Sequence, residues 1–502
     1  MPSPTPSAPK ADPSLVSVSS LRLTRGTIAR YATGSLGTGG FATLPGLVLT
    51  YYLTDSLGVA ALAAGLVITV AKVWDVVIDP VIGALTDRDL ARHGSRRRLM
   101  LIGALALPLL FALTFAVPPA LGPVVGAIWV LIAFTLTATA FSLFQVPYIA
   151  LPAELTPDYD ERTRLLTWRV VVLTFAILLF GAGGPALRRS AEDPVLGYLI
   201  MGVVSGVVIG IGMLVATTVA RHPARETRGR PAVGESSSAG RVSPPPGAES
   251  GNGGGTAAAE RVSMRTHYAS GIRALRRSLP FRALLATFVL QALATGLMLA
   301  GAQYVATWVL HDQAAVELLF IALIAPALLA APAWGVVARR IGKERTFAIA
   351  SVVFAAAALS ILGVLWAPGA WIYVPVGIAG IAYAGLQSLP MAMLPDVISH
   401  DEQQNGPGRA GAFSGVWTAG ETVGFALGAM VLSIILAVTG YVSSTAGQLV
   451  EQPDAAITGI VVSFSVVPAA LIALSLVTLA RYPLRRVDIE AHRAADIQSQ
   501  PG

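Results

Sequence analysis

Three ionisable residues lie within an otherwise apolar stretch of the sequence. Lys72, Asp75 and Asp79 occur in the run Val-Ala-Lys-Val-Trp-Asp-Val-Val-Ile-Asp-Pro. The spacings of three and four residues place all three side chains on one face of a helix. A charged side chain near the centre of a bilayer costs about 2.5 to 3.5 kcal/mol on insertion scales, so such a cluster indicates a functional site if the helix crosses a membrane.

The composition is that of an integral membrane protein. The chain has 502 residues, 54% hydrophobic and 13% charged, and its mean hydropathy is +0.68; soluble domains carry roughly 25% charged residues. Long, continuous apolar runs approach or exceed the roughly 20 residues that a helix needs to cross a bilayer, and they lack the alternation of a β-barrel. The twelve predicted spans are 28–54, 57–85, 99–118, 122–151, 164–187, 195–220, 279–308, 314–338, 346–366, 370–399, 410–440 and 455–480.

Basic residues gather in alternate connections between these spans. They occur in 88–98, in 339–345 and in 481–486, whereas the opposite connections carry few, chiefly Arg188 and Arg189. The positive-inside rule therefore predicts that both termini face the cytoplasm. Topology also accounts for the net charge of +7, so no nucleic-acid partner is expected. The absence of cysteine excludes disulfides and thiolate metal sites.

One long polar segment divides the chain. Residues 221–276 contain Ser-Ser-Ser-Ala-Gly, Pro-Pro-Pro-Gly and Asn-Gly-Gly-Gly, a composition that predicts a disordered cytoplasmic linker. The predicted organisation is a cytoplasmic tail (1–27), a six-helix bundle (28–220), the linker, a second six-helix bundle (277–482) and a second cytoplasmic tail (483–502).

The two halves repeat each other. Residues 147–154 and 390–396 share one Pro-to-Pro spacing followed by an acidic residue, and 83–88 resembles 335–340 at the start of a basic connection. Parallel six-helix repeats are how one large class of transporters builds a central cavity.

These residues resemble the glycoside-pentoside-hexuronide:cation symporter family of the major facilitator superfamily. The resemblance rests on Tyr-Tyr-Leu-Thr-Asp-Ser-Leu-Gly at 51–58, on 72–83, on Val-Pro-Tyr at 146–148, on Glu-Arg at 161–162 and on 393–402. It covers 28–480 apart from the linker. It implies an all-α integral membrane protein whose 12 transmembrane helices form two pseudo-symmetric six-helix bundles, the major facilitator fold.

The resemblance places a cation site on Asp75 and Asp79, with the Ser142 hydroxyl beside them. Gln145 and Gly39 stand at positions where the family's melibiose carriers have aspartates that bind the sugar. The position of Gln145 also belongs to the sodium site of those carriers. Because this chain lacks the carboxylate oxygens of those aspartates, sodium is less favoured as the coupling ion and a proton is a possible alternative. If sodium is the ion, Asp75 and Asp79 are the expected metal ligands; no other cofactor is expected.

The predicted substrate contacts are Lys72, Arg169, Gln145, Gly39, Glu421 and Thr422. The resemblance places Arg169 in the sugar cavity, although an arginine at a cytoplasmic helix end can also extend to the interface. Thr422 stands where the family usually has lysine. Glu421 beside it has three open roles: proton carrier, substrate contact, or partner of Lys72. Lys72 also has a second interpretation, in which it only forms a buried ion pair with Asp75.

If the two bundles move against each other during transport, contacts between them must stabilise one conformation over the other. The predicted conformational latch consists of Asp87, Arg88, Arg96, Arg97, Arg339 and Arg340, which would pair across the interface in one state only. Exposed pairs contribute about 0 to 1 kcal/mol each, so several must act together.

The resulting hypothesis is a secondary active transporter of the plasma or inner membrane, surrounded by membrane lipid and acting as a monomer. It would carry a small-molecule substrate, a sugar or glycoside, together with a proton or sodium ion. The first alternative is a lysophospholipid or other amphipathic solute on the same fold; a sensor or scaffold is the second. No catalytic or nucleotide motif occurs in the sequence, so enzyme activity is not expected.

Overall fold

The computed structural model describes residues 23–156, 158–220, 278–405, 410–446, 448 and 450–484. The predicted linker and most of both predicted tails lie outside these residues. Within them, regular structure is helical apart from one isolated bridge between Leu57 and Thr445.

The first group of helices is α1 (Arg25–Thr33), α2 (Ser35–Asp55), α3 (Ala61–His93), α4 (Arg97–Thr114), α5 (Gly122–Leu155), α6 (Tyr159–Arg188) and α7 (Pro194–Thr217). The second group is α9 (Leu279–Tyr304), α10 (Ala315–Ile341), α11 (Lys343–Ser360), α12 (Tyr373–Asn405), α13 (Ala410–Val438), α14 (Asp454–Phe464) and α15 (Val466–Ala480). Short segments add a turn at Pro119–Leu121, Val305–Val309, Ile361–Leu365 and Ala370–Ile372.

The twelve predicted spans are confirmed as helices or helix pairs. Among the described residues, eleven helical segments are long and apolar enough to cross a membrane, and the pair α1 and α2 covers the first predicted span. This pair meets at Gly34, where an added Cβ would lie 2.6 Å from the Tyr148 ring. The last span is also divided, into α14 and α15 at Ser465.

Side-chain caps fix where several helices begin. Thr24 accepts a hydrogen bond from the Thr27 backbone N–H, so α1 begins at Arg25 and extends into the predicted N-terminal tail. Asp158 and Ser278 cap α6 and α9 in the same way. Each such cap stabilises its helix by about 0.5 to 2 kcal/mol.

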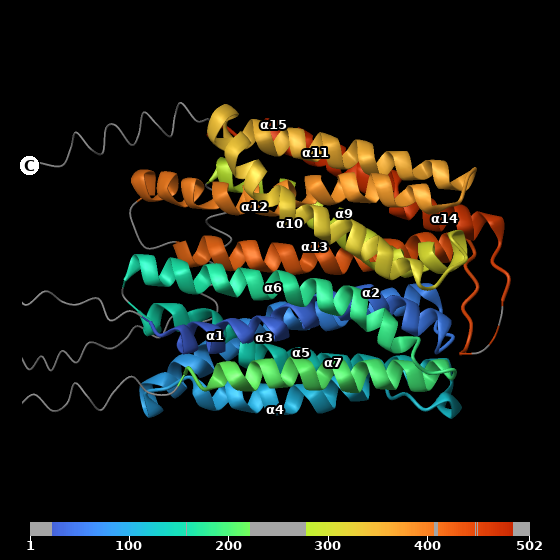
Figure 1. Cartoon of the computed structure of the whole chain (residues 1–502), viewed down its shortest axis with the longest axis horizontal. Coiled ribbons are helices and arrows are strands. Elements are labelled where there is room, and N and C mark those ends of the chain that lie inside the picture. The colour runs from blue at the N-terminus through green and yellow to red at the C-terminus, as the bar shows by residue number, and fades with distance from the viewer. Residues whose placement is uncertain are drawn as a thin grey trace, which may run out of the picture.

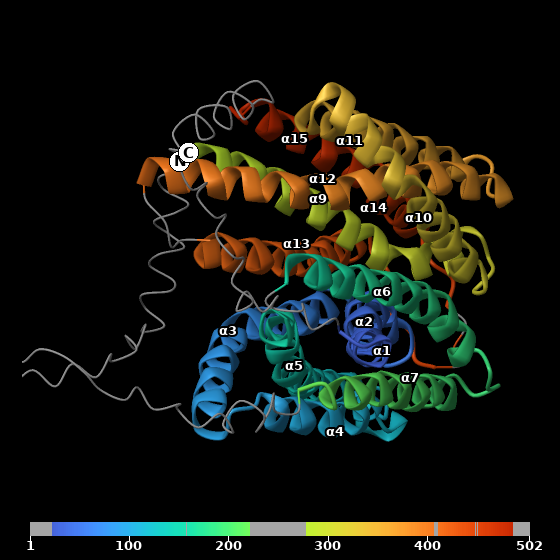
Figure 2. The same ribbon diagram turned by 60° about the vertical axis from the view of Figure 1, so that its left-hand side comes forward.

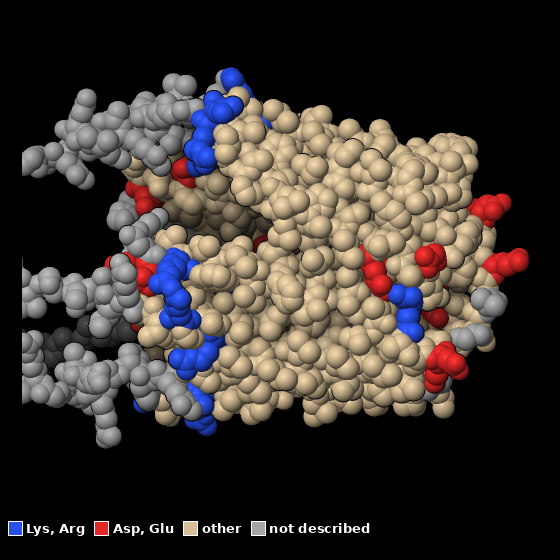
Figure 3. Space-filling view, in the orientation of Figure 1, with Lys and Arg blue, Asp and Glu red and all other residues tan. Residues whose placement is uncertain are grey.

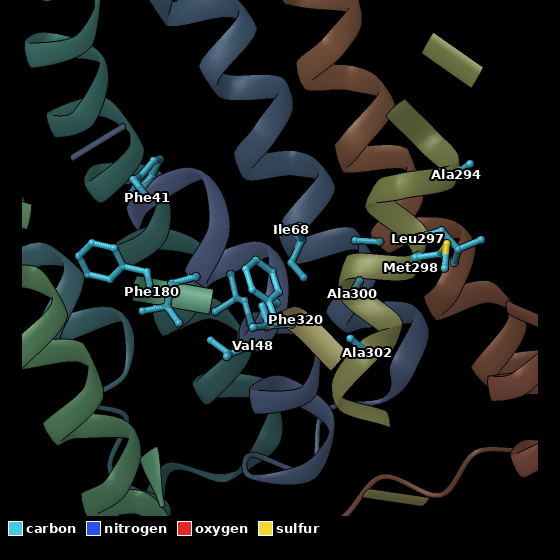
Figure 4. Packing of buried hydrophobic residues seen from close by; sticks show 14 of the residues in the cluster. Phe41, Val48, Ile68, Phe180, Ala294, Leu297, Met298, Ala300, Ala302 and Phe320 are labelled. Carbon is cyan, nitrogen blue, oxygen red and sulfur yellow. The ribbon is translucent and has the colours of Figure 1, made fainter. Parts of the chain in front are cut away.

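The two groups lie side by side as layers of roughly parallel and antiparallel helices (Figures 1 and 2). The most extensive contacts between the groups join α3 with α13, α6 with α10, and α2 with α9. Glycine permits two of these approaches, because a Cβ at Gly65 would lie 2.5 Å from Ser433 and one at Gly181 would lie 2.0 Å from Phe320. Figure 4 shows Phe320 of α10 near Val48 of α2, so the apolar core continues across the interface.

Candidate functional site

The charged cluster predicted from the sequence lies on one face of α3. Lys72 Nζ is 3.2 Å from Asp75 Oδ2. The Oδ1 atoms of Asp75 and Asp79 are buried without a hydrogen-bond partner among the described residues, and Ser142 of α5 lies near enough to interact with the Asp79 carboxyl group. Lys72 therefore compensates part of the charge of one carboxylate, and two carboxylate oxygens remain able to take up a cation or proton.

Aromatic rings hold the lysine beside this pair. The Lys72 ammonium lies 5.1 Å from the ring centre of Phe41 and 5.5 Å from that of Phe134. Cation–π contacts of this kind contribute about 0.5 to 2 kcal/mol, more where water is excluded. Lys72 also lines a cavity between the two helix groups, so the charged cluster borders the space in which a solute would bind.

The cavity has two compartments. The small compartment, of about 240 Å³, is lined by Lys72 from the first group and by Glu421 and Thr422 from the second. The large compartment, of about 650 Å³, lies between α6, α10 and α12, and Glu421 lines it as well. Figure 3 shows the molecule hollowed at the end where most of the visible Lys and Arg side chains lie. We call this the basic end.

Two of the residues predicted to contact substrate or cation lie in helix contacts. Gln145 Oε1 accepts a 2.8 Å hydrogen bond from Thr38, which joins α5 to α2. Gly39 is buried against α6, where an added Cβ would lie 2.7 Å from Ala176. Neither residue lines the two compartments, so the structure places both in helix packing beside the cavity.

Arg169 of α6 lies beside the Tyr148 ring. Its guanidinium group lies 5.4 Å from the ring centre of Tyr148, and its Nε atom is buried without a hydrogen bond among the described residues. Arg169 does not line either compartment. A direct contact of Arg169 with the solute stays a prediction.

The end opposite the basic loops is closed by a buried network that the sequence did not reveal. Asp55 Oδ1 accepts a 2.6 Å hydrogen bond from the Tyr441 hydroxyl, and its Oδ2 accepts one from Thr54 at 2.5 Å. The Thr54 hydroxyl also lies 2.6 Å from the Tyr304 hydroxyl. Asp55 is 9% exposed. The available signal was an acidic residue at the end of an apolar span, within the motif at 51–58.

Further contacts strengthen this closed end. The Ser444 N–H donates to the Thr54 carbonyl at 2.9 Å, and the Ala446 N–H donates to the Ser56 carbonyl at 3.1 Å. Arg188, only 5% exposed, donates to Gln313. The neighbouring Arg189 pairs with Glu317. The two arginines that break the charge pattern of the connections thus join the halves at this end.

Of the predicted latch residues, Arg96 and Asp87 form an ion pair that lies within the first group and does not cross between the halves. Arg96 pairs with Asp87 at 2.9 Å and with Glu154 at 2.5 Å, all within the first group. Burial alone would lower the pKa of the Arg96 guanidinium, but the hydrogen bonds and charges of Glu154 and Asp87 raise it above its ordinary value. Arg88, Arg339 and Arg340 are exposed, and Arg97 is half-buried. Pairing across the interface in another state stays a prediction.

A family model described as MFS/sugar transport protein matches residues 30–242 and 255–486. The chain belongs to this family. Membership agrees with the helix order, the paired helix groups and the cavity between them. The resemblance found in the sequence is thereby confirmed, and the protein is a multi-pass membrane transporter.

Related proteins support the same assignment. The chain is 25% identical to the putative glycoside/cation symporter YagG of Escherichia coli (strain K12), over 90% of this chain and 92% of the relative. It is 24% identical to the glucuronide carrier protein homolog of the same organism, over 94% and 97%. Among solved structures, the D-xylose-proton symporter superposes with a TM-score of 0.63 at 14% identity, covering 91% of this chain and 98% of that one. This last likeness concerns the fold.

Proposed function

We propose that this transporter couples the movement of a sugar or glycoside to a cation bound at Asp75 and Asp79. The observation that carries the proposal is the pair of buried Oδ1 atoms, one helical turn apart beside the cavity, that have no hydrogen-bond partner among the described residues. Two carboxylates this close repel each other in a low-dielectric site, and uptake of positive charge relieves that repulsion. Filling the site therefore stabilises one arrangement of the surrounding helices over another.

We propose a proton as the coupling ion. The Lys72 ammonium already lies 3.2 Å from Asp75, and like charge disfavours a metal ion beside it. Among the described residues, no group of three or more His, Cys, Asp or Glu side chains could hold a metal. The Gln145 oxygen is engaged by Thr38. A proton needs only one carboxylate oxygen, whereas sodium would have to find its ligands in Asp75, Asp79 and Ser142.

The structure has the features of one state of an alternating-access cycle. One end is closed by the network of Asp55, Tyr441 and Thr54, and the basic end is hollowed. Because basic connections remain in the cytoplasm, we assign the basic end and both termini to the cytoplasmic side of the plasma or inner membrane. The state is then inward-open. One chain contains a complete cavity between its halves, so we propose that the monomer transports.

The names of two relatives, glycoside/cation symporter and glucuronide carrier homolog, favour a sugar or glycoside as the solute. One observation favours a second candidate, an amphipathic solute such as a lysophospholipid. The wall of the large compartment is mainly apolar, with Leu, Ile, Val, Ala, Phe and Met side chains. Apolar walls suit a solute with a substantial apolar part.

Reconstitution into liposomes tests the coupling. Purified protein would be given an imposed proton gradient or an imposed sodium gradient, and uptake of labelled monosaccharides, glycosides and lysophospholipids would be followed. We expect accumulation above equilibrium with the proton gradient alone. Uptake that only equilibrates the solute under both gradients would make the protein a facilitator and would overturn the coupling proposal.

A further inference from the structure

Helices α6 and α10 are held together near the closed end and border an opening nearer the basic end. Arg189, which follows α6, pairs with Glu317 of α10. Gly181 of α6 packs directly against the Phe320 ring of α10. Farther along both helices, the large compartment lies between them. Figure 3 views the molecule across its helices and shows the hollow from the side, with α6 below it and α10 and α12 above it in the same view (Figure 1). The hollow therefore opens sideways, toward the surface that a bilayer covers.

The apolar wall of the large compartment continues onto that surface. Leu328 of α10 lines the compartment and is 42% exposed, whereas Leu329 beside it is 83% exposed and lies outside the lining. Deeper in the compartment, Phe320 and Ile324 of the same helix are buried. The lining on α10 extends from Leu319 to Ala331, about 18 Å at 1.5 Å per residue. A groove of this length matches an acyl chain of one leaflet, because two leaflets share a hydrocarbon core of about 30 Å.

Several polar side chains of this wall keep their hydrogen bonds within the protein. The Thr174 and Ser388 hydroxyl groups donate their only hydrogens to carbonyls of their own helices. The Gln387 amide donates to the Tyr383 hydroxyl. Contact with hydrocarbon leaves these bonds intact and so costs little. The charged Glu421 lies where the large compartment adjoins the small one, so an acyl chain that follows α6 and α10 leaves its carboxylate to the solute.

Basic side chains stand beyond the compartment toward the basic end. Arg164 of α6 lies one turn before the exposed Trp168, and Arg340 of α10 lies one turn after the exposed Val336, so each arginine shares a face with an exposed apolar residue. Arg164 also pairs with Glu161 at 3.4 Å, and a guanidinium group with five N–H donors can bind a phosphate as well. Figure 3 shows Lys and Arg side chains on both sides of the hollow. Basic residues between membrane helices at this depth are typical of lipid headgroup sites.

We propose that the opening between α6 and α10 binds a phospholipid of the surrounding bilayer, with one acyl chain in the large compartment and its phosphate at Arg164 and Arg340. The chain covers apolar wall that would otherwise face water. The lipid comes from the leaflet at the basic end, where the two arginines lie, and it is a partner of the protein rather than its cargo. A ligand favours the conformation that it binds, so this lipid stabilises the arrangement in which the opening exists.

Photochemical crosslinking tests whether the chain enters the compartment. The full chain would be placed in nanodiscs of phosphatidylglycerol and phosphatidylcholine that contain a diacyl phosphatidylglycerol with a diazirine midway along one acyl chain. Leu323 lines the compartment, whereas any lipid around the protein reaches Leu329 of the same helix. We expect mass spectrometry to find adducts at both residues in comparable yield. Adducts at Leu329 without adducts at Leu323 would overturn the proposal. Adducts at Leu323 from a lysophospholipid probe alone would indicate a single-chain solute and would overturn it too.

A matched pair of variants on α10 locates the chain. Ala331 and Ala333 are both exposed, but Ala331 lines the compartment and Ala333 lies outside the lining. Ala331→Phe should lower the Leu323-to-Leu329 adduct ratio several-fold, because its ring occupies the path of the chain. Ala333→Phe should preserve the ratio. Equal ratios in the two variants would contradict an acyl chain in this groove.

The phosphate contacts are tested in the same nanodiscs. The double variant Arg164→Gln/Arg340→Gln should lower the adduct yield at Leu323 several-fold, whereas Arg98→Gln, at an exposed position of α4, should not. An unchanged yield in the double variant would contradict the assigned phosphate contacts. None of these measurements uses a solute or an ion gradient, so their outcome is independent of the coupling proposal.

Discussion

Glu154 and Asp396 form equivalent ion pairs in the two halves of the chain. Each follows the second proline of a Pro-to-Pro motif in a long helix: Glu154 comes two residues after Pro152 in α5, and Asp396 comes one residue after Pro395 in α12. Each accepts from a basic residue at the start of the preceding helix: Glu154 from Arg96 and Asp396 from Lys343, both at 2.5 Å. The internal repeat seen in the sequence is thus a repeated ion pair at the basic end.

We expect the two ion pairs to contribute similarly to stability. The variants Glu154→Gln and Asp396→Asn should each lower the free energy of unfolding by about 1 kcal/mol, because both pairs are only partly exposed. The two effects should add, since the pairs lie in different halves. Thermal unfolding in nanodiscs, with Glu451→Gln at an exposed position as control, measures this. If only one variant lowers the free energy of unfolding, the two ion pairs do not contribute equally to stability.

Neutralising either helix α3 carboxylate should uncouple transport. Asp75→Asn and Asp79→Asn should each abolish gradient-driven accumulation while the protein still inserts, because an amide cannot take up and release the proposed coupling proton. Uptake into liposomes and size-exclusion profiles check both statements. Asp89→Asn, on the same helix and paired with His93, serves as control. Normal accumulation by either site variant would contradict the assigned ion site.

Removing the Glu421 charge should affect the solute more than the ion. Glu421→Gln keeps the size of the side chain but loses charge-assisted hydrogen bonds, which contribute about 1.5 to 3 kcal/mol each to binding. Solute affinity should fall accordingly, and proton dependence should persist. Titration and gradient-driven uptake distinguish the two, with Thr418→Ala at an exposed position of α13 as control. Lost proton dependence with unchanged affinity would instead make Glu421 the proton carrier.

Loosening the closed end should shift the conformational balance. Tyr441→Phe removes the hydroxyl that donates to the buried Asp55 carboxylate, and leaving a buried acceptor unsatisfied costs about 1 to 3 kcal/mol. The variant should therefore spend more time open at that end. Because the chain has no cysteine, Thr50→Cys can report access to the cavity by its labelling rate with an impermeant reagent added from the Asp55 side.

The control for this labelling is Tyr482→Phe, near the basic end and remote from Asp55. We expect a labelling rate several-fold above the parent in Tyr441→Phe and no change in Tyr482→Phe. Unchanged labelling in Tyr441→Phe would mean that the side-chain network does not hold this end closed.

Much of the fold could be predicted from the sequence, because long apolar runs define membrane helices. The break at Gly34 could not, since it depends on the Tyr148 ring that packs against it. In the site, helical periodicity placed Lys72, Asp75 and Asp79 on one face. It could not show that Gly39 faces α6, because an aligned position carries no information on which neighbour a helix face meets.

The closed end was missed for a different reason. Asp55 and Tyr441 are 386 positions apart in the sequence, and their contact exists only in a particular arrangement of the two halves. No local pattern reports a contact of that kind. Arg188 and Arg189 were visible as exceptions to the charge pattern, yet their partners Gln313 and Glu317 lie beyond the linker.

The main-chain hydrogen bonds from Ser444 and Ala446 to Thr54 and Ser56 have a consequence for the evolution of this carrier. Substituting a side chain leaves the donor and acceptor of such a bond in place unless the new residue is proline. These main-chain hydrogen bonds at the closed end can therefore be conserved while the surrounding side chains change during evolution. Relatives with quite different residues around position 55 could retain the same closure at this end and diverge mainly in what they carry.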